Sequence, residues 1–129
     1  MVFQVDPRSP TPIWEQIVNQ IKEFVLKGIL VPEDKIPSVR ELASTLVINP
    51  NTVSKAYQEL ERQGIIETLR GRGTYISKKL TIMTDEKKIK QLQEKTKQLV
   101  IEGTYLGLNT NTFIQWLKEL EKELGGSGR

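Results

Sequence analysis

The sequence of 129 residues has the composition of a folded protein and is long enough for one domain, or one domain with a short appendage. It contains no cysteine and no histidine, which excludes disulfides, thiolate nucleophiles, zinc ribbons and histidine-based catalysis. The net charge is only +3, so any role in nucleic-acid binding depends on where the cations lie.

The pattern also argues against enzymes and membrane proteins. The carboxylates fall mostly on charged helix faces, where a solvated surface is the simpler interpretation, so we expect no enzyme, no metal site and no cofactor. The sequence contains no run of about 18 apolar residues, which a membrane span needs. Its first residues, MVFQVDPRSP, lack both the basic stretch and the apolar segment of a signal peptide. We therefore expect a cytoplasmic protein without a membrane partner.

The first expected helix begins at Thr11-Pro12, where a capping threonine precedes a proline at the first helical position. Its apolar residues recur three and four apart and form one wide stripe, made of Ile13, Trp14, Ile17, Val18, Ile21, Phe24 and Val25. Gly28 is expected to end the helix in the left-handed conformation that glycine adopts without strain.

Two shorter helices are expected next. After the polar turn VPEDK, the pair Ser38 and Glu41 predicts a capping box, in which each side chain accepts a hydrogen bond from the other residue's amide. Asn49-Pro50 begins the third helix by the same cap-then-proline rule, and Gly64 ends it. Its apolar face consists of Val53, Ala56, Tyr57 and Leu60, and the opposite face carries Asn51, Lys55, Gln58 and Arg62.

Two β-prone runs, IIETL and TYIS, lie on either side of the loop RGRG and predict a β-hairpin. Two short helices joined by a tight turn and followed by a hairpin make up a winged helix-turn-helix, with the first helix completing the core. The tip of such a hairpin meets the DNA backbone or the minor groove. Gly71 and Gly73 would let the main chain approach closely, while Arg70 and Arg72 meet phosphate or a narrow groove. We therefore expect a mainly α fold with a small β-hairpin that carries positive charge.

The chain from about Met83 onward has a different pattern. Apolar residues recur three and four apart among lysines and glutamines, first at Ile89, Leu92, Thr96 and Leu99 and, after the connection GTYLGLNTN, at Phe113, Leu117, Leu120 and Leu124. Narrow apolar seams on charged helices are typical of helices that bury against partners. We expect a winged helix-turn-helix domain at residues 1–79, followed at 80–129 by a two-helix dimerisation segment with the linker-like tail GGSGR.

The stretch IPSVRELASTLVINPNTVSKAYQELERQGIIETLRGRGTYI resembles, over its whole length, the N-terminal domain of GntR-type bacterial transcription regulators. The motifs PSVRELA, NPNTVSKAYQELE and GRGT stand in the family's order and spacing, and the similarity covers residues 10 to 78. The short C-terminal part looks like the YtrA subfamily, which lacks a large effector domain and dimerises through these helices. The resemblance implies a homodimeric regulator, and a repressor, that binds a palindromic operator in double-stranded DNA with its third helix in the major groove.

Transferred position by position, the resemblance assigns DNA contacts to the second helix, the start of the third helix and the wing. The residues are Ser38, Arg40, Asn51, Thr52, Ser54, Lys55, Tyr57, Arg70, Gly71, Arg72, Gly73 and Thr74. Among them, Tyr57 would reach a phosphate through its hydroxyl, although its ring lies on the core side. The competing interpretation for Arg40 is a surface salt bridge, and for Asn51 and Thr52 it is helix capping. The expected dimer interface consists of Ile89, Leu92, Leu99, Phe113, Leu117, Leu120 and Leu124.

Two positions depart from the family pattern. Val47 stands in the turn between the second and third helices, where the family usually has glycine, and Pro32-Glu33-Asp34 stands where it usually has Pro-Gly-Asp. A β-branched residue in a left-handed conformation is strained. We therefore expect the turn at Val47 to adopt another geometry.

Two other functions stay open. A winged helix can be a protein–protein module whose C-terminal seams bind the partner, but this predicts a neutral or acidic recognition face, unlike the one formed by Asn51, Lys55, Arg70 and Arg72. A small-molecule-sensing adaptor would need a cleft between the C-terminal helices, which enclose little volume unless a dimer completes it. The sequence leaves the operator, the regulated genes, any effector and the sign of regulation open.

Overall fold

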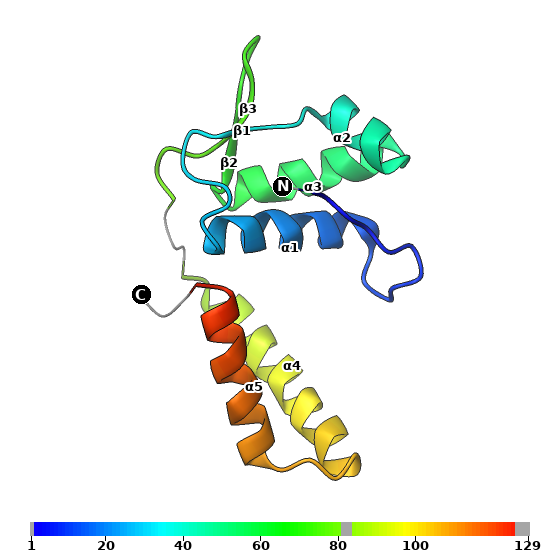
Figure 1. The fold of residues 1–129 in the computed structure, drawn as a ribbon, viewed down its shortest axis with the longest axis vertical. Helices are drawn as coiled ribbons and strands as arrows, with labels where there is room; N and C mark the ends of the chain where they lie inside the picture. Colours follow the sequence, from blue (N-terminus) through cyan, green and yellow to red (C-terminus); the bar gives the residue numbers. More distant parts are fainter. Residues whose placement is uncertain (1, 81–83, 126–129) are drawn as a thin grey trace. The chain divides into compact units, whose positions relative to one another are not determined.

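The computed structural model describes residues 2–80 and 84–125, and the chain divides into two compact units, residues 1–81 and 82–129. The first unit contains three helices and a small sheet, and the second contains two helices (Figure 1). The elements are α1 (Ile13–Leu26), β1 (Lys35–Ile36), α2 (Val39–Leu46), α3 (Pro50–Arg62), β2 (Ile66–Leu69), β3 (Gly73–Ile76), α4 (Glu86–Tyr105) and α5 (Thr110–Glu123). Their order confirms the expected mainly α fold with a β-hairpin.

The core of the first unit lies between its three helices and the inner face of the sheet. Helix α3 packs against α1, α2 and β2. The expected apolar faces are buried there, as are residues from the connections and strands; the full set is Ile17, Val18, Ile21, Leu30, Ile36, Leu42, Ala43, Val53, Ala56, Tyr57, Leu60, Ile66 and Ile76. Because α3 is held by three neighbours, its position is fixed while its polar face stays open to a ligand.

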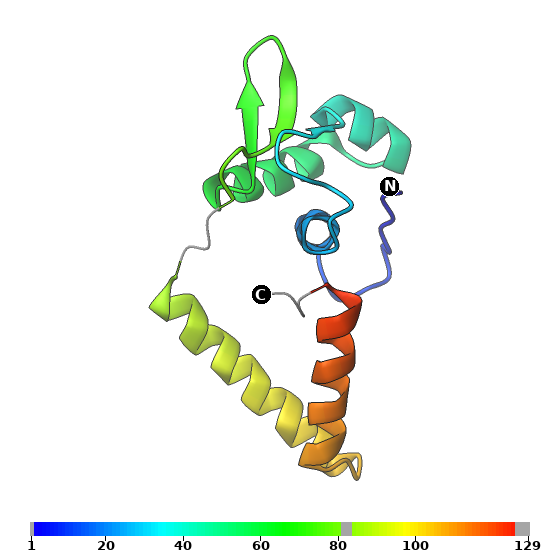
Figure 2. The same cartoon turned by 60° about the vertical axis from the view of Figure 1, so that its left-hand side comes forward.

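The three strands form one antiparallel sheet in the order β1-β3-β2. The hairpin of β2 and β3 confirms the prediction, and in Figures 1 and 2 it projects from the unit on the side away from α1. Strand β1 is a feature that the sequence pattern does not predict, because two residues are too few to show alternation. It pairs with β3 through Lys35↔Tyr75 and Ile36↔Thr74, and so supports one edge of the hairpin.

The starts of α2 and α3 confirm the predicted caps. The hydroxyl oxygen of Ser38 accepts a hydrogen bond from the amide of Glu41 at 3.1 Å, and the Glu41 carboxylate accepts one from the amide of Ser38 at 3.0 Å. These hydrogen bonds, first from the backbone and then from the side chain of Ser38, lower the pKa of Glu41. At α3, Asn49 Oδ1 accepts a hydrogen bond from the amide of Asn51 at 2.8 Å, and Pro50 is the first helical residue.

The start of α1 differs from the prediction by one residue. Pro12 is the N-cap, with an extended ψ of 147°, and no side chain caps the helix, so Ile13 is the first helical residue. The predicted cap, Thr11, is held instead through its carbonyl oxygen, which accepts a hydrogen bond from Gln16 Nε2 at 2.8 Å. A glutamine inside the helix thus fixes the entering chain. The predicted end is confirmed, because Gly28 follows the last turn with φ 74°.

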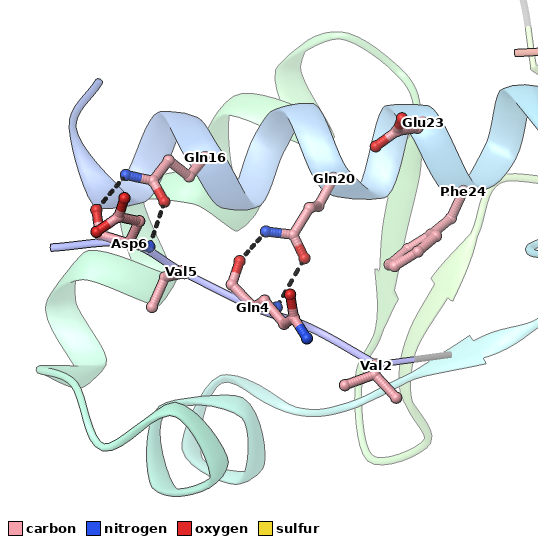
Figure 3. Close-up of a pocket in the computed structure, with 8 residues that line it drawn as sticks. All are labelled: Val2, Gln4, Val5, Asp6, Gln16, Gln20, Glu23 and Phe24. Atoms are coloured by element: carbon pink, nitrogen blue, oxygen red, sulfur yellow. Dashed lines mark hydrogen bonds between the residues drawn. The ribbon is translucent and has the colours of Figure 1, made fainter. Parts of the chain in front are cut away.

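An extended N-terminal arm, which the sequence analysis does not predict, lies along α1 (Figure 3). The side-chain amide of Gln20 accepts a hydrogen bond from the backbone amide of Gln4 at 2.9 Å and donates one to the carbonyl oxygen of Gln4. One turn earlier, Gln16 makes the same pair of hydrogen bonds with Asp6, at 2.8 and 2.9 Å. Two glutamines four residues apart therefore pair with alternate residues of the arm, as a neighbouring strand would.

Two non-glycine residues have a left-handed backbone. Val47, between α2 and α3, has φ 55° and ψ 54°, and Glu33 has φ 76°. The expectation that the turn at Val47 adopts another geometry is therefore wrong. The amide of Ile48 reaches back to the carbonyl oxygen of Ala43 at 3.0 Å, a helix ending that needs a left-handed residue at position 47. Val47 adopts this conformation at a strain of about 1–2 kcal/mol, and its side chain is exposed.

In the second unit, α4 continues through Gly103 to Tyr105, so the connection to α5 is shorter than GTYLGLNTN and spans residues 106–109. Gly103 is buried because the ring of Phe113 packs directly on it, and a Cβ at this position would clash with that ring. The Phe113 ring also meets the Trp116 ring edge to face, with centroids 5.4 Å apart. Away from this contact α4 and α5 diverge (Figure 2).

Parts of the sequence prediction fall outside the described residues. These are the start of the C-terminal part around Met83 and the tail GGSGR after its first glycine. Within the ranges that the structure describes, no helix is both long enough and apolar enough to cross a membrane.

Candidate nucleic-acid interface

The polar face of α3 carries four of the predicted DNA contacts in its first two turns. Asn51 and Lys55 are exposed, and Thr52 and Ser54 beside them are half-buried. The side chain that caps the helix belongs to Asn49, so capping does not explain the side chain of Asn51. Short polar groups at the N-terminal end of a helix can bond to phosphate oxygens and base edges, where the helix dipole also favours negative charge.

Arg40 lies in the first turn of α2 with an exposed side chain. Within residues 2–80 and 84–125 it forms no ion pair, so the salt-bridge interpretation finds no support. A guanidinium group without a carboxylate partner keeps all its donors for phosphate or for a guanine edge. Ser38, two residues earlier, uses its hydroxyl oxygen as the helix cap and can still donate its hydroxyl hydrogen.

Lys55 has a partner that the sequence analysis does not find. Its Nζ lies 4.6 Å from the centre of the Trp14 ring on α1, a distance typical of a cation–π interaction. The contact holds the ammonium group near the start of α1 and gives Trp14 a role in addition to core packing. Helical periodicity could not reveal it, because the two residues lie on different helices.

Tyr57 is withdrawn from the protein surface, which corrects the prediction for this residue. Its exposed fraction is 5%, and its hydroxyl donates a hydrogen bond of 2.6 Å to the carbonyl oxygen of Pro37. Burial raises the pKa of the phenol, and the charge of Glu41 adds a smaller contribution in the same direction. The hydroxyl therefore ties α3 to the segment before α2 and is not free to bind phosphate.

The wing turn joins β2 to β3 through Arg70, Gly71 and Arg72. The amide of Arg72 donates a hydrogen bond to the carbonyl oxygen of Leu69 at 2.8 Å, and Gly71 has φ 78°, the positive value required at the third position of a type II turn. Both arginine side chains are exposed, and neither forms an ion pair with any other described residue. The wing thus presents two unpaired cations at its tip.

The last two residues of the predicted wing set have different roles. Gly73 has φ 112°, a backbone conformation that strains any residue with a side chain, so the local geometry of the strand already favours glycine. Thr74 is only 7% exposed and pairs with Thr68 and Ile36 in neighbouring strands. The prediction that Thr74 contacts DNA is therefore corrected: its side chain supports the sheet.

The predicted interface residues of the second unit are mostly exposed. Leu92, Leu99 and Leu117 keep 63%, 57% and 66% of their surface accessible. Because α4 and α5 diverge, they do not bury each other's seams. Further apolar residues that the seam pattern does not predict are also exposed: Val100, Ile101, Tyr105, Leu106, Ile114 and Trp116. Of the expected set, Phe113 and Leu124 are half-buried, and Ile89 and Leu120 remain about half exposed.

The described residues of the first unit line pockets on two of its surfaces. One of about 410 Å³ lies between the N-terminal arm and α1 (Figure 3), where Gln16 and Gln20 already bond to the arm. The other, of about 300 Å³, lies on the outer face of the wing, where Glu67, Arg72 and Tyr75 line it. In the first pocket the two amide groups are occupied by the chain itself, so the pocket offers few free polar groups to a small ligand.

Comparisons with known proteins agree with this arrangement. The family model for "Bacterial regulatory proteins, gntR family" matches residues 13–76. The HTH-type transcriptional repressor YtrA of Bacillus subtilis is 54% identical over 125 residues, which cover 97% of this chain and 96% of that protein.

Solved structures show the same similarity. A transcriptional antiterminator from Listeria monocytogenes EGD-e superposes with a TM-score of 0.85 at 42% identity, covering 98% of this chain and 95% of that chain. The DNA-binding domain of AraR in complex with operator ORX1 gives a TM-score of 0.51 at 29% identity, over 59% of this chain and 93% of that chain. The last similarity relates the first unit to a structure that holds DNA.

Proposed function

This chain belongs to the GntR family of bacterial regulatory proteins, and we propose that it is a homodimeric repressor of transcription that binds an inverted-repeat operator. Like the members of its family and its relatives, it is a transcription regulator that binds DNA, and it is not an enzyme. The Bacillus subtilis relative is named a transcriptional repressor, which supports repression as the proposed direction of regulation. We place its action in the cytoplasm, where bacterial DNA is accessible.

The main support for the proposal is a set of exposed arginines near α3. Arg40 on α2 and Arg70 and Arg72 on the wing are exposed and form no ion pair within the ranges described. A protein gains no stability from cations held without partners, whereas each cation that meets a phosphate releases condensed counterions and strengthens DNA binding. The fold carries this charge on an α2–α3 pair and a hairpin, which are the elements that a winged helix-turn-helix applies to DNA.

In the proposed complex α3 enters the major groove, and the wing follows the backbone or the adjacent minor groove. Asn51, Thr52 and Ser54 then meet bases and phosphates near the start of α3. Arg40 crosses to a guanine edge or a fixed phosphate, where a specific base contact is worth roughly 1–3 kcal/mol. Arg72 contacts phosphates, which are the same for every sequence, or a narrow minor groove. The two cations therefore contribute to binding in different ways.

The exposed seams of α4 and α5 support the proposed dimer. Their apolar side chains lack cover within their own unit, and a second copy of the same helices could bury them. A two-fold dimer presents two recognition helices to symmetry-related half-sites, so its operator is an inverted repeat. A protein–protein module without DNA binding has less support, because the polar face of α3 and the wing tip are cationic.

Selection from a pool of random DNA duplexes tests the proposed function. We expect the full chain to enrich an inverted repeat whose half-site centres lie about one helical turn, or a multiple of it, apart. A protein with both Arg40→Ala and Arg72→Ala serves as the control and should enrich little. A pool that stays random with the wild-type protein, or an enriched single half-site, would contradict the proposal.

Salt titrations of the single variants then separate the two kinds of contact. Arg72→Ala should weaken binding to the selected operator and to a scrambled duplex by similar factors, and should reduce the salt slope by about one charge. Arg40→Ala should weaken the operator more than the scrambled duplex. Unchanged affinities for Arg72→Ala would show that the wing is only a turn.

A further inference from the structure

One side chain on the outer face of the wing reaches back to its tip. Tyr75, in β3, donates a hydrogen bond from its hydroxyl to the carbonyl oxygen of Arg72 at 2.8 Å. Gly73 lies between them, and a Cβ there would be 3.8 Å from Tyr75 Cε2. This is an ordinary contact distance, so the Tyr75 ring lies close beside the Gly73 backbone.

Two strands flank Tyr75 in the sheet. It faces outward in the middle strand of the sheet, with Lys35 of β1 opposite on one side and Glu67 of β2 opposite on the other. The stem of Lys35 covers the Gly73 backbone next to it. A pocket opens between Tyr75, Glu67 and Arg72, so the hydrogen bond from the hydroxyl, and not packing on both sides, fixes the direction of the ring.

The two wing arginines differ in how their backbone is held. Both main-chain groups of Arg72 are bonded, its amide to the Leu69 carbonyl at 2.8 Å and its carbonyl oxygen to the Tyr75 hydroxyl at 2.8 Å. No side chain of the described chain bonds to Arg70. Arg72 is also flanked by Gly71 and Gly73, both with positive φ, so without the tyrosine its carbonyl group would be held only through the turn and the strand pairing of Gly73.

We propose that Tyr75 is a positioning residue that holds Arg72, but not Arg70, ready for a DNA phosphate. The inference rests on the proposed function and extends it to a residue that makes no DNA contact of its own. A backbone segment that is ordered before binding loses less entropy in the complex. The phenol ring alone cannot give this order, because the hydroxyl supplies the only bond from Tyr75 to the Arg72 backbone among those the structure describes.

A double-mutant cycle tests this role. Tyr75→Phe removes the hydroxyl and keeps the ring, so the fold should be kept and the melting temperature should fall by no more than the loss of one partly exposed hydrogen bond explains. We expect it to weaken binding to both the selected operator and a scrambled duplex by roughly threefold to tenfold, because the complex must then order backbone that the hydroxyl no longer holds. In the Arg72→Ala background the same substitution should have no further effect. In the matched Arg70→Ala background it should have its full effect.

Backbone NMR order parameters of the free protein give a readout that is independent of DNA. In Tyr75→Phe the values at Arg72 and Gly73 should fall, while those in α3 stay unchanged. Wild-type affinity for Tyr75→Phe would overturn the inference and leave the proposed function intact. An equal loss in the Arg72→Ala background would also overturn it, because Tyr75 would then contact DNA itself. Wild-type protein that binds neither duplex would contradict the proposed function.

Discussion

The two units of the chain treat their apolar residues in opposite ways. In the first unit Ile17, Ile21 and Leu60 have no exposed surface, and the elements that cover them belong to the same unit. In the second unit Leu92 and Leu117 are more than half exposed. One unit therefore completes its core from its own elements, while the other has apolar surface that its own two helices do not cover. The stability of the first should depend on its own packing and that of the second on association.

The largest effect is expected in the core of the first unit. Ile21→Ala should lower its free energy of unfolding by about 2–5 kcal/mol, because the substitution leaves a cavity among fully buried side chains. Since no partner is involved, the loss should not depend on protein concentration. Urea titrations at two concentrations a hundredfold apart measure both quantities. A loss that changes with concentration would mean that this core, too, depends on association.

A seam residue of the second unit should behave in the opposite way. Leu117→Ala removes a side chain that is 66% exposed in the single chain, so it should have little effect on unfolding at nanomolar concentration. At concentrations where dimers form, it should weaken the dimer by about 1–2 kcal/mol, because most of an apolar side chain is lost from the interface. Lys118→Ala, on the neighbouring position, is the control. Equal effects of the two variants on dimerisation would contradict the proposal that the apolar seam forms the dimer interface.

The N-terminal arm adds a third case, because side-chain amides bond to its backbone while Phe3 and Val5 pack against the core. Gln20→Ala removes two hydrogen bonds to Gln4 and should lower the stability of the first unit by about 1 kcal/mol. Hydrogen exchange at the amide of Gln4 should become faster at the same time. Asn19→Ala, at an exposed neighbouring position, is the matched control and should change neither quantity.

Relief of the backbone strain at Val47 should change the free energy of unfolding by a smaller amount, and in the opposite direction. Val47→Gly should raise the free energy of unfolding by roughly 0.5–1 kcal/mol, since glycine removes the left-handed strain but has more freedom in the unfolded chain. Ser44→Gly, in the last turn of α2, should lower it instead. Thermal unfolding of both variants checks the sign. A destabilised Val47→Gly would show that the exposed valine contributes something that its backbone conformation does not explain.

The smallest effect on stability is expected from the charge of Glu41, and it should depend on pH. The pKa of Glu41 is lowered in the folded state, so its charge stabilises α2 above the ordinary value of 4.5, and this contribution is lost as the pH falls through the folded pKa. Glu41→Gln should therefore reduce the melting temperature slightly at neutral pH, and the difference from wild type should disappear in strong acid. A difference that persists in acid would assign the effect to the shape of the side chain instead of its charge.

The sequence predicts those elements whose signals are local. Asn49-Pro50, the Ser38–Glu41 pair and the glycines after α1 and α3 each act within one turn of backbone, so the element boundaries follow from neighbouring residues. The wing follows for the same reason, because its two strands are joined by a short loop. The left-handed turn at Val47 shows the limit of such rules: helix closure by Ile48 overrides the preference of a β-branched residue.

Contacts between distant segments could not be read from the same patterns. The arm, β1, the Lys55–Trp14 contact and the packing of Phe113 on Gly103 each join parts of the chain that no periodicity relates. The same limit explains the errors in the candidate site. Tyr57 and Thr74 occupy motif positions, but the hydroxyl of one is used by Pro37 and the side chain of the other faces the sheet interior. A motif places a residue in an element, while packing decides which of its atoms stay free.

Sedimentation equilibrium of the full chain, and of a chain that ends after Lys79, tests the division between the two units most directly. The full chain should sediment at twice its mass of 14.8 kDa at micromolar concentration, and the shortened chain as a folded monomer with a cooperative melting transition. A full chain that is monomeric under these conditions, or a shortened chain that still dimerises, would contradict the account.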